Sequence, residues 1–252
     1  MLDMVPRLSA ILWISITVLQ FFLAMMILRW HAWKRYPVMS IYVGWQAVGG
    51  VAGLLIAAFA PPMPYFFAYY VDTLLADIIA FAVALELYYK VCDPRIGLSV
   101  WRPRHMVIMI AVSSSMAIMF GLLWAAKNGG SWTRTMVTME EIMNVALWAT
   151  FCILLIYWRS LGFTWRPLPG GIALGFLLYL TISVISVFIR GRLSLGAALI
   201  AGQVEMAANI LSLAWWLGIF RAEEKPLEAT PAQVEETPGR YSETMEAASK
   251  ML

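Results

Sequence analysis

The sequence predicts an all-α membrane protein, a bundle of seven transmembrane helices. Of its 252 residues, 62% are hydrophobic and 13% are charged, whereas a soluble globular domain has about 45–50% apolar and about 25% charged residues. The charged residues are also clustered, and they leave seven apolar stretches long enough to cross a bilayer. Because a helix satisfies its own backbone hydrogen bonds in lipid, each stretch is expected to be helical.

Each predicted span contains 20 to 27 residues, enough for a helix of about 30 Å or more at about 1.5 Å per residue. The spans cover residues 8–28, 38–60, 65–89, 106–126, 137–158, 170–189 and 194–220. Short turns rich in proline or glycine join several of them, at residues 61–64, 128–130 and 166–169. Such turns hold consecutive helices antiparallel and close together, and residues 1–220 form a single transmembrane domain.

Basic residues orient the predicted bundle. With the N-terminus outside, the Lys and Arg residues near the span ends number eleven on the cytoplasmic side and five on the outer side, as the positive-inside rule requires. The cluster of Arg29, Lys34 and Arg35 follows the first span, so that span is expected to remain in the mature protein rather than to be cleaved as a signal peptide. We therefore expect a multi-pass protein of the bacterial inner (cytoplasmic) membrane.

Residues 221–252 differ sharply in composition from the spans. They contain seven Glu, four basic residues and three Pro, with almost no aromatic side chains. Such a segment cannot bury enough apolar surface to fold alone, so we expect a disordered acidic tail in the cytoplasm. The tail is a candidate binding segment for a membrane or cytoplasmic protein partner.

Six carboxyl side chains lie within the predicted spans, which contain no Lys, Arg or His. A charge at the bilayer centre costs at least about 2.5–3.5 kcal/mol, so depth decides which acids need an explanation. Asp77 and Glu205 lie deepest, each about 16–18 Å below the outer boundary when counted along the helix. With no internal cation nearby, we expect both to be neutral or to share a proton.

Both deep acids belong to rows of small or polar residues at helical spacing. The rows contain Thr73, Asp77, Ala80 and Ala84 in one span, and Ala198, Gly202, Glu205, Asn209 and Ser212 in the other. These rows are expected to face the bundle interior. The candidate ligand or proton site therefore consists of Asp77, Glu205, Thr73, Gln203 and Asn209. The alternative is that two neutral acids only hold helices together through hydrogen bonds.

The shallower polar residues have simpler structural interpretations. Glu86 precedes Lys90 by one helical turn and can pair with it near the inner interface. Glu141 follows Thr138 in a Thr-x-x-Glu capping pattern at the outer start of the fifth span, where Glu140 can remain solvated. The secondary site candidates are Glu86, Glu141 and Asn144.

Three pairs of small residues at a spacing of four predict close contacts between helices. They are Gly49 with Gly53, Gly171 with Gly175, and Ala198 with Gly202. Small side chains at this spacing let two helix backbones approach each other.

Several function classes lack the residues that they need. A retinal pigment requires a Schiff-base lysine on the seventh helix, and residues 194–220 contain no lysine, so retinal is excluded. The only histidines, His31 and His105, lie in predicted inner loops, and Cys92 and Cys152 match no metal or redox spacing. The basic residues lie at span ends, where topology explains them, so no nucleic acid is expected. We expect no enzymatic activity, no cofactor and no metal.

Three segments carry a resemblance to known proteins. They run from Tyr69-Tyr70 to Tyr88-Tyr89, from Met139-Glu140-Glu141 to Leu154-Leu155, and from Leu161-Gly162-Phe163-Thr164-Trp165-Arg166 to Gly175-Phe176. Together they resemble a family of uncharacterised bacterial seven-transmembrane-helix proteins, and distantly the seven-helix sensory regions of some histidine kinases. The resemblance implies a seven-helix membrane fold and no assigned activity.

Two functions remain open at this point. The first is a non-enzymatic membrane protein that acts as a small-ligand sensor, or as an accessory subunit whose tail binds a partner. The second is a proton-coupled transporter of a small molecule that uses Asp77 and Glu205.

Overall fold

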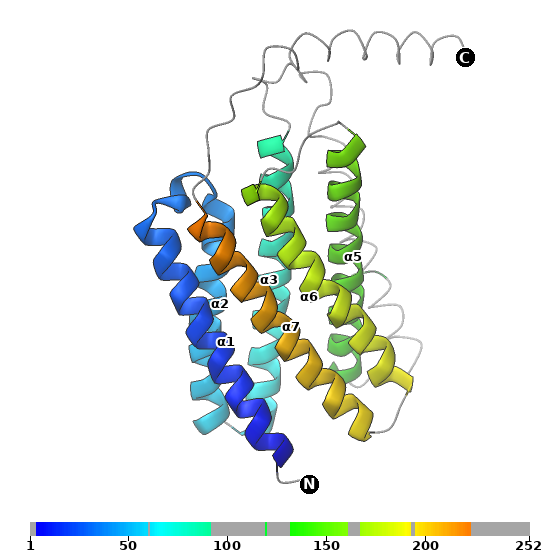
Figure 1. The fold of residues 1–252 in the computed structure, drawn as a ribbon. Helices are drawn as coiled ribbons and strands as arrows, with labels where there is room; N and C mark the ends of the chain where they lie inside the picture. The colour runs from blue at the N-terminus through cyan, green and yellow to red at the C-terminus, as the bar shows by residue number, and fades with distance from the viewer. Residues whose placement is uncertain are drawn as a thin grey trace, which may run out of the picture.

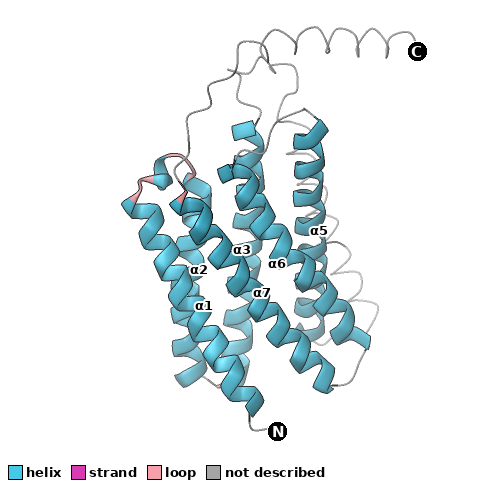
Figure 2. Cartoon of the chain, in the orientation of Figure 1, coloured by secondary structure: helices cyan, strands magenta, loops and turns pink. Residues whose placement is uncertain are grey.

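The structure is a computed structural model that describes residues 4–59, 61–91, 119, 132–160, 167–192 and 195–222. Six long helices and one short 3-10 helix form its described elements: α1 (Met4–Arg29), η1 (Ala32–Lys34), α2 (Pro37–Phe59), α3 (Pro62–Val91), α5 (Trp132–Ser160), α6 (Pro167–Arg192) and α7 (Leu195–Arg221). These residues include no strand (Figure 2). The all-α prediction is confirmed. The predicted fourth span, residues 106–126 apart from Met119, and nearly all of the predicted tail lie outside the described residues.

The six long helices form a closed ring. Helix α1 packs against α2, α2 against α3, α3 against α5, α5 against α6, and α6 against α7. Contact between α7 and α1 closes this six-helix ring, and α3 also touches α6 across it.

The helices alternate in direction with one exception. Helices α1, α3, α5 and α7 run one way and α2 and α6 the other, so that α1 starts and α7 ends at opposite ends of the bundle (Figure 1). The neighbours α3 and α5 run parallel, as an intervening span between them would require. The fourth span, which would bring the total to seven, and the orientation in the membrane stay predictions.

The composition of the helices identifies a multi-pass membrane protein. Within the described residues, five helical segments are long and apolar enough to cross a membrane, namely Leu8–Arg29, Pro37–Phe59, Pro64–Lys90, Thr138–Ile156 and Leu168–Ser186. Helix α7, which carries Gln203, Glu205 and Asn209, is not among these five segments. It packs between α6 and α1 as an integral part of the ring.

The outer surface of the ring is apolar, as lipid contact requires. Large hydrophobic side chains with more than half of their surface exposed occur on several helices, including Phe22 (61%), Met25 (68%), Val48 (65%), Ile156 (69%), Ile200 (63%) and Leu211 (59%). Such side chains are at home against acyl chains and would be unusual in this number on a soluble monomer.

An aromatic cluster fills the centre of the ring. The Phe176 ring of α6 stacks on Phe151 of α5, with 4.6 Å between centroids, and packs at 4.8 Å against Trp216 of α7. Tyr42 of α2 lies 5.0 Å from Phe176. Aromatic pairs at these distances are favourable beyond the area they bury. This cluster joins four helices and forms one side of the candidate site described below.

Helices α3 and α6 each begin earlier than predicted. Pro62 and Pro64 lie in the first turn of α3, and Pro167 and Pro169 lie in the first turn of α6, although these residues were expected to form turns. Proline is compatible with a first helical turn because the amide hydrogens there need no partner within the helix.

The predicted capping pattern at the fifth span is wrong. Helix α5 begins at Trp132, so Thr138 lies in its second turn and not at its N-terminus. No Gly or Pro occurs between Trp132 and Thr138 to end the helix there. Thr138, Glu140 and Glu141 are all half-buried side chains along α5.

Two of the three predicted close contacts are present. A Cβ atom added to Gly49 would lie 2.6 Å from Asp72 Oδ1, and one added to Gly53 would lie 2.9 Å from Trp13. On α6, Gly171 meets Ile219 and Gly175 meets the Trp216 indole of α7. At Gly202, by contrast, an added Cβ would meet no described atom within 4 Å.

Candidate functional site

Polar side chains line the interior of the six-helix ring. Those that are buried come from five of the six long helices: Thr17, Gln20, Asp77, Glu86, Asn144, Thr150, Ser183, Ser186 and Ser212, with Tyr42 and Gln46 of α2 and Asn209 of α7 half-buried beside them. Buried polar groups in membrane proteins are costly unless they find partners, so their arrangement identifies the candidate site.

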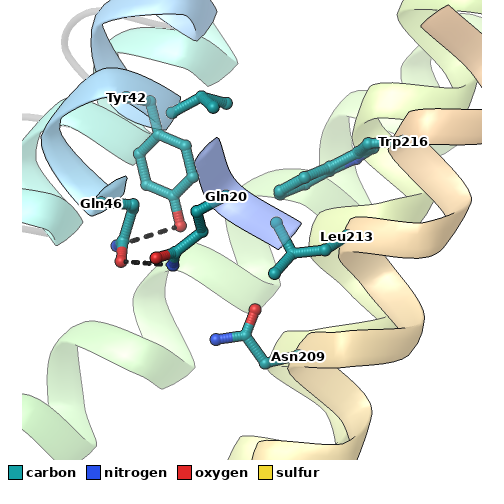
Figure 3. A pocket seen from close by; sticks show the side chains of 7 residues that line it. Gln20, Tyr42, Gln46, Asn209, Leu213 and Trp216 are labelled. Atoms are coloured by element: carbon teal, nitrogen blue, oxygen red, sulfur yellow. Dashed lines mark hydrogen bonds between the residues drawn. The ribbon is translucent and has the colours of Figure 1, made fainter. Parts of the chain in front are cut away.

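A small cavity lies between α1, α2 and α7. Its walls are formed by Gln20 of α1, Tyr42, Val43 and Gln46 of α2, and Asn209, Leu213 and Trp216 of α7 (Figure 3). The cavity leaves about 10 Å³ for the centre of a water molecule, which is room for about one water. None of these wall residues is charged, so the cavity is suited to an uncharged molecule that forms hydrogen bonds.

A short chain of hydrogen bonds crosses this cavity. Gln20 Nε2 donates to Gln46 Oε1 at 3.3 Å, and Gln46 Nε2 donates to Tyr42 Oη at 3.5 Å (Figure 3). Gln20 is only 3% exposed, yet its Oε1 has no hydrogen-bond partner among the described residues. A buried acceptor without a partner costs about 1–3 kcal/mol, and a bound donor would remove that cost.

Asp77 lies in a second polar cluster, between α2, α3, α5 and α6. Its side chain is 8% exposed, and its Oδ2 has no hydrogen-bond partner in the part of the chain that is described. Asp77 interacts electrostatically with Glu140 of α5, Tyr42 of α2 and Tyr179 of α6. Glu140 itself is half-buried. Tyr42 belongs to both the cavity and this cluster, and so connects them.

Glu205 lies in a different environment from Asp77. Ser183 of α6 is fully buried and donates a 2.6 Å hydrogen bond to Glu205 Oε1. The helices that carry the two acids, α3 and α7, are not neighbours in the ring. The interactions that the structure provides for Asp77 and for Glu205 therefore involve different residues, although Tyr179 and Ser183 both belong to α6.

The other predicted site residues are distributed over both regions. Asn209 lines the cavity, as its place in the predicted row indicates. Thr73 donates to the backbone oxygen of Tyr69 at 3.0 Å, one turn earlier in its own helix. Asn144 is buried on α5, while Gln203 and Glu141 are half-buried and both have partners.

Glu86 has a structural role near the C-terminal end of α3. Its Oε1 accepts a hydrogen bond from Val38 N at 3.1 Å, and its Oε2 accepts one from Met39 N at 2.9 Å. These donors belong to the first turn of α2, which begins at Pro37. Lys90 also interacts electrostatically with Glu86, as the sequence predicts.

Sequence reasoning missed three residues of the cavity, namely Gln20, Tyr42 and Gln46. Isolated neutral amides in apolar spans carry no charge signal, and the reasoning from depth considered only acids. The spacing of Tyr42 and Gln46, which places both on one face of a helix, was the available signal.

The described residues contain no group of three or more His, Cys, Asp or Glu side chains that could hold a metal ion. Comparisons of the chain with protein-family models, curated proteins and solved structures find no match.

Proposed function

We propose that this protein is a non-enzymatic membrane sensor of a small uncharged ligand, which binds in the cavity between α1, α2 and α7. The observation that carries the proposal is the unpartnered Gln20 Oε1 in a cavity lined by neutral hydrogen-bonding side chains. A ligand with one hydrogen-bond donor and a small apolar part matches these walls, because Leu213 and Trp216 provide apolar surface opposite the amides.

The size of the cavity links binding to movement. The present space admits about one water molecule. A larger ligand therefore has to displace α1 or α7, since the cavity lies beside their contact. A ligand that binds only the displaced arrangement shifts the population toward it, which is the thermodynamic requirement for a sensor.

Helix α7 connects the cavity with the end of the chain. Asn209, Leu213 and Trp216 lie on one face of α7, and the helix continues to Arg221, where the predicted cytoplasmic tail begins. A shift of this helix would move the start of the tail. The proposal therefore includes a membrane or cytoplasmic protein partner that reads the position of the tail.

A thermal-stability screen of the purified full-length protein tests the ligand site. The panel consists of small uncharged amides, alcohols and ureas, and binding raises the unfolding temperature. We expect at least one compound to stabilise the parent protein and the Gln203→Leu variant, but not the Asn209→Leu variant. Gln203 is the matched control because it is an amide on α7 that does not line the cavity.

A hit that stabilises Asn209→Leu as well as the parent would contradict the assigned site. A panel that yields no hit would contradict the choice of an uncharged ligand. Removal of residues 222–252 tests the output separately: partner capture from native membranes should be lost, while ligand binding should persist.

A second function is favoured by the unpartnered Asp77 Oδ2. A proton-coupled carrier requires a buried carboxyl that can gain and lose a proton, and both Asp77 and Glu205 are available for this role. This alternative predicts solute uptake into liposomes that is driven by a pH gradient and survives loss of the tail. Uptake that ignores the gradient, or that persists in Asp77→Asn with Glu205→Gln, would contradict it.

A further inference from the structure

The loop that joins α1 to α2 exposes basic and aromatic side chains together. Trp30 and Trp33 are 41% and 45% exposed. Trp side chains that lie open beside cations are typical of a surface at the level of lipid headgroups, because the indole has an apolar body and a polar N–H group. We call the following exposed residues the loop patch: Arg29, Trp30, His31, Trp33, Lys34 and Arg35.

A short hydrogen-bonded turn holds the loop patch in place. His31 has a φ of 55°, the only positive φ of a residue other than glycine among the described residues. Its N–H donates to Leu28 O at 3.2 Å, and Lys34 N donates to His31 O at 3.0 Å. Lys34 Nζ lies 5.6 Å from the centre of the Trp33 ring, which is a favourable distance for a cation and an aromatic face. The ammonium group and the indole are therefore presented side by side.

Positive charge dominates this end of the bundle. Helix α7 packs along α1 in the same direction, so its last residue, Arg221, lies at the same end as the loop patch (Figure 1). Of the six described acids, five lie no further along than the middle of α3, α5 or α7. The sixth, Glu86, is bonded to the start of α2 and interacts with Lys90. Arg29, Lys34 and Arg221 thus have no acidic partner among the described residues.

Exposed apolar surface adjoins the loop patch on α1. Leu28 immediately precedes Arg29 and is 63% exposed, and Met25, about one turn earlier, is 68% exposed. The positive charges are therefore continuous with a face of α1 that is suited to acyl chains. An anion that carries acyl chains matches both parts of this surface, whereas a soluble anion matches only the charged part.

We propose that the loop patch binds the headgroup of an anionic phospholipid, with Arg29 and Lys34 at the phosphate and the acyl chains along the exposed face of α1. Basic residues that cluster at the end of a transmembrane helix attract anionic headgroups, and each positive charge adds to the attraction. A zwitterionic lipid has no net charge and binds this surface more weakly. The loop patch shares no residue with the cavity between α1, α2 and α7, so either site can exist without the other.

Native mass spectrometry of the full-length protein in an uncharged detergent tests the proposal. Phosphatidylglycerol and phosphatidylcholine of the same chain length are titrated separately, and the lipid-bound fraction gives the affinity. We expect phosphatidylglycerol to bind more tightly by about tenfold or more, and Arg29→Gln or Lys34→Gln to weaken its binding about fivefold, as loss of one charge near a membrane surface does.

Lys90→Gln is the matched control for the two variants. It removes a positive charge from the same end of the bundle, but the Lys90 ammonium already interacts with Glu86 and lies 5.9 Å from the centre of the Tyr36 ring. We expect this variant to bind phosphatidylglycerol as the parent does. Unfolding temperatures establish that each variant is folded, and either Arg29→Gln or Lys34→Gln decides the test if the other does not fold.

Four results would overturn the proposal. The first is equal affinity of the parent for the two lipids. The second is equal weakening in Lys34→Gln and Lys90→Gln. The third is equally tight binding of glycerol phosphate, which would assign the loop patch to a soluble anion. The fourth is selective lipid binding only after removal of residues 222–252, which would show that the acidic tail occupies the loop patch in the full-length protein.

Discussion

A single side chain, Glu86, joins the C-terminal end of α3 to the N-terminal end of α2. Helix α2 has no acidic residue in its first turn, and the amide hydrogens at a helix N-terminus lack partners within the helix. Glu86 of α3 supplies both missing acceptors for Val38 and Met39. Its negative charge also suits the positive end of the α2 dipole. The acid that looked like half of a surface ion pair is therefore an external cap.

Replacing Glu86 by Ala should lower the stability of the protein by about 2–3 kcal/mol, because two charge-assisted hydrogen bonds are lost at a buried helix end. The thermal unfolding temperature in detergent measures this effect. Lys90→Met is the control and should cost less than about 1 kcal/mol, since it removes only the ion pair. Equal losses in the two variants would show that the cap contributes little.

Ser183 gives a second prediction at this scale. Its hydroxyl group is fully buried and bonded to Glu205, whereas Ser15 on α1 bonds only to the backbone of its own helix. Ser183→Ala should therefore cost about 1 kcal/mol, a value typical of one hydrogen bond between membrane helices. Ser15→Ala should cost close to nothing. Denaturant titration in mixed micelles checks both, and an unchanged midpoint for Ser183→Ala would contradict the assignment.

The sequence identified residues that carry a charge and missed neutral ones. Asp77 and Glu205 stood out because an acid within an apolar span is rare and costly. Gln20 and Gln46 are as important to the cavity, but an amide in a membrane helix is also common as simple packing. Only the three-dimensional arrangement shows that Gln20 Oε1 has no hydrogen-bond partner among the described residues.

For most of the described helices, the sequence predicts where the helix begins and ends to within a few residues. The apolar length needed to cross lipid determines where a span lies, and α2, predicted at 38–60, is observed as Pro37–Phe59. Helix α5 deviates more, since it starts at Trp132 and not near residue 137. The additional first turn of α5 contains polar residues, so a prediction based on hydropathy alone does not assign it to the helix.

Glycines on α6 set the distance between α6 and α7. A methyl group at Gly175 would collide with the Trp216 indole, whose Nε1 donates to Ile172 O at 3.1 Å. Gly175→Ala should destabilise the protein by about 1–3 kcal/mol, as overpacking does. Gly218→Ala is the matched control, because an added Cβ there meets no described atom within 4 Å.

The same unfolding experiment distinguishes the two glycine variants. Gly218→Ala should be neutral or slightly stabilising, since Ala favours a helix over Gly by about 1 kcal/mol. If Gly175→Ala were also stabilising, the close approach of α6 and α7 would be wrong.

At the scale of the whole molecule, the closure of the ring could not be predicted. Apolar runs show which segments cross the membrane, but lipid-facing and protein-facing residues are both apolar, so they do not show which helices are neighbours. The contact of α7 with α1 brings residues about 190 positions apart to one cavity, as Gln20 and Asn209 show. The predicted row of small and polar residues on α7 correctly indicated that Asn209 and Ser212 face the bundle interior. It did not indicate that the neighbours of α7 are α6 and α1.

The ring places its two polar regions at different contacts between helices. The cavity between α1, α2 and α7 lies at the contact that closes the ring, while the Asp77 cluster lies between α2, α3, α5 and α6. A ligand would act on the closing contact between α7 and α1. Tyr42 of α2 belongs to both regions and connects them.

All of these assignments depend on a polar ring interior that is shielded from lipid. Oxygen accessibility of single spin labels, placed at residues 20, 22, 209 and 211 of a cysteine-free protein in liposomes, measures this shielding most directly. Phe22 and Leu211 are 61% and 59% exposed, whereas Gln20 is 3% exposed and Asn209 lines the cavity. We predict high accessibility at 22 and 211 and low accessibility at 20 and 209. Equal accessibility at all four positions, or the reverse order, would contradict the closed ring.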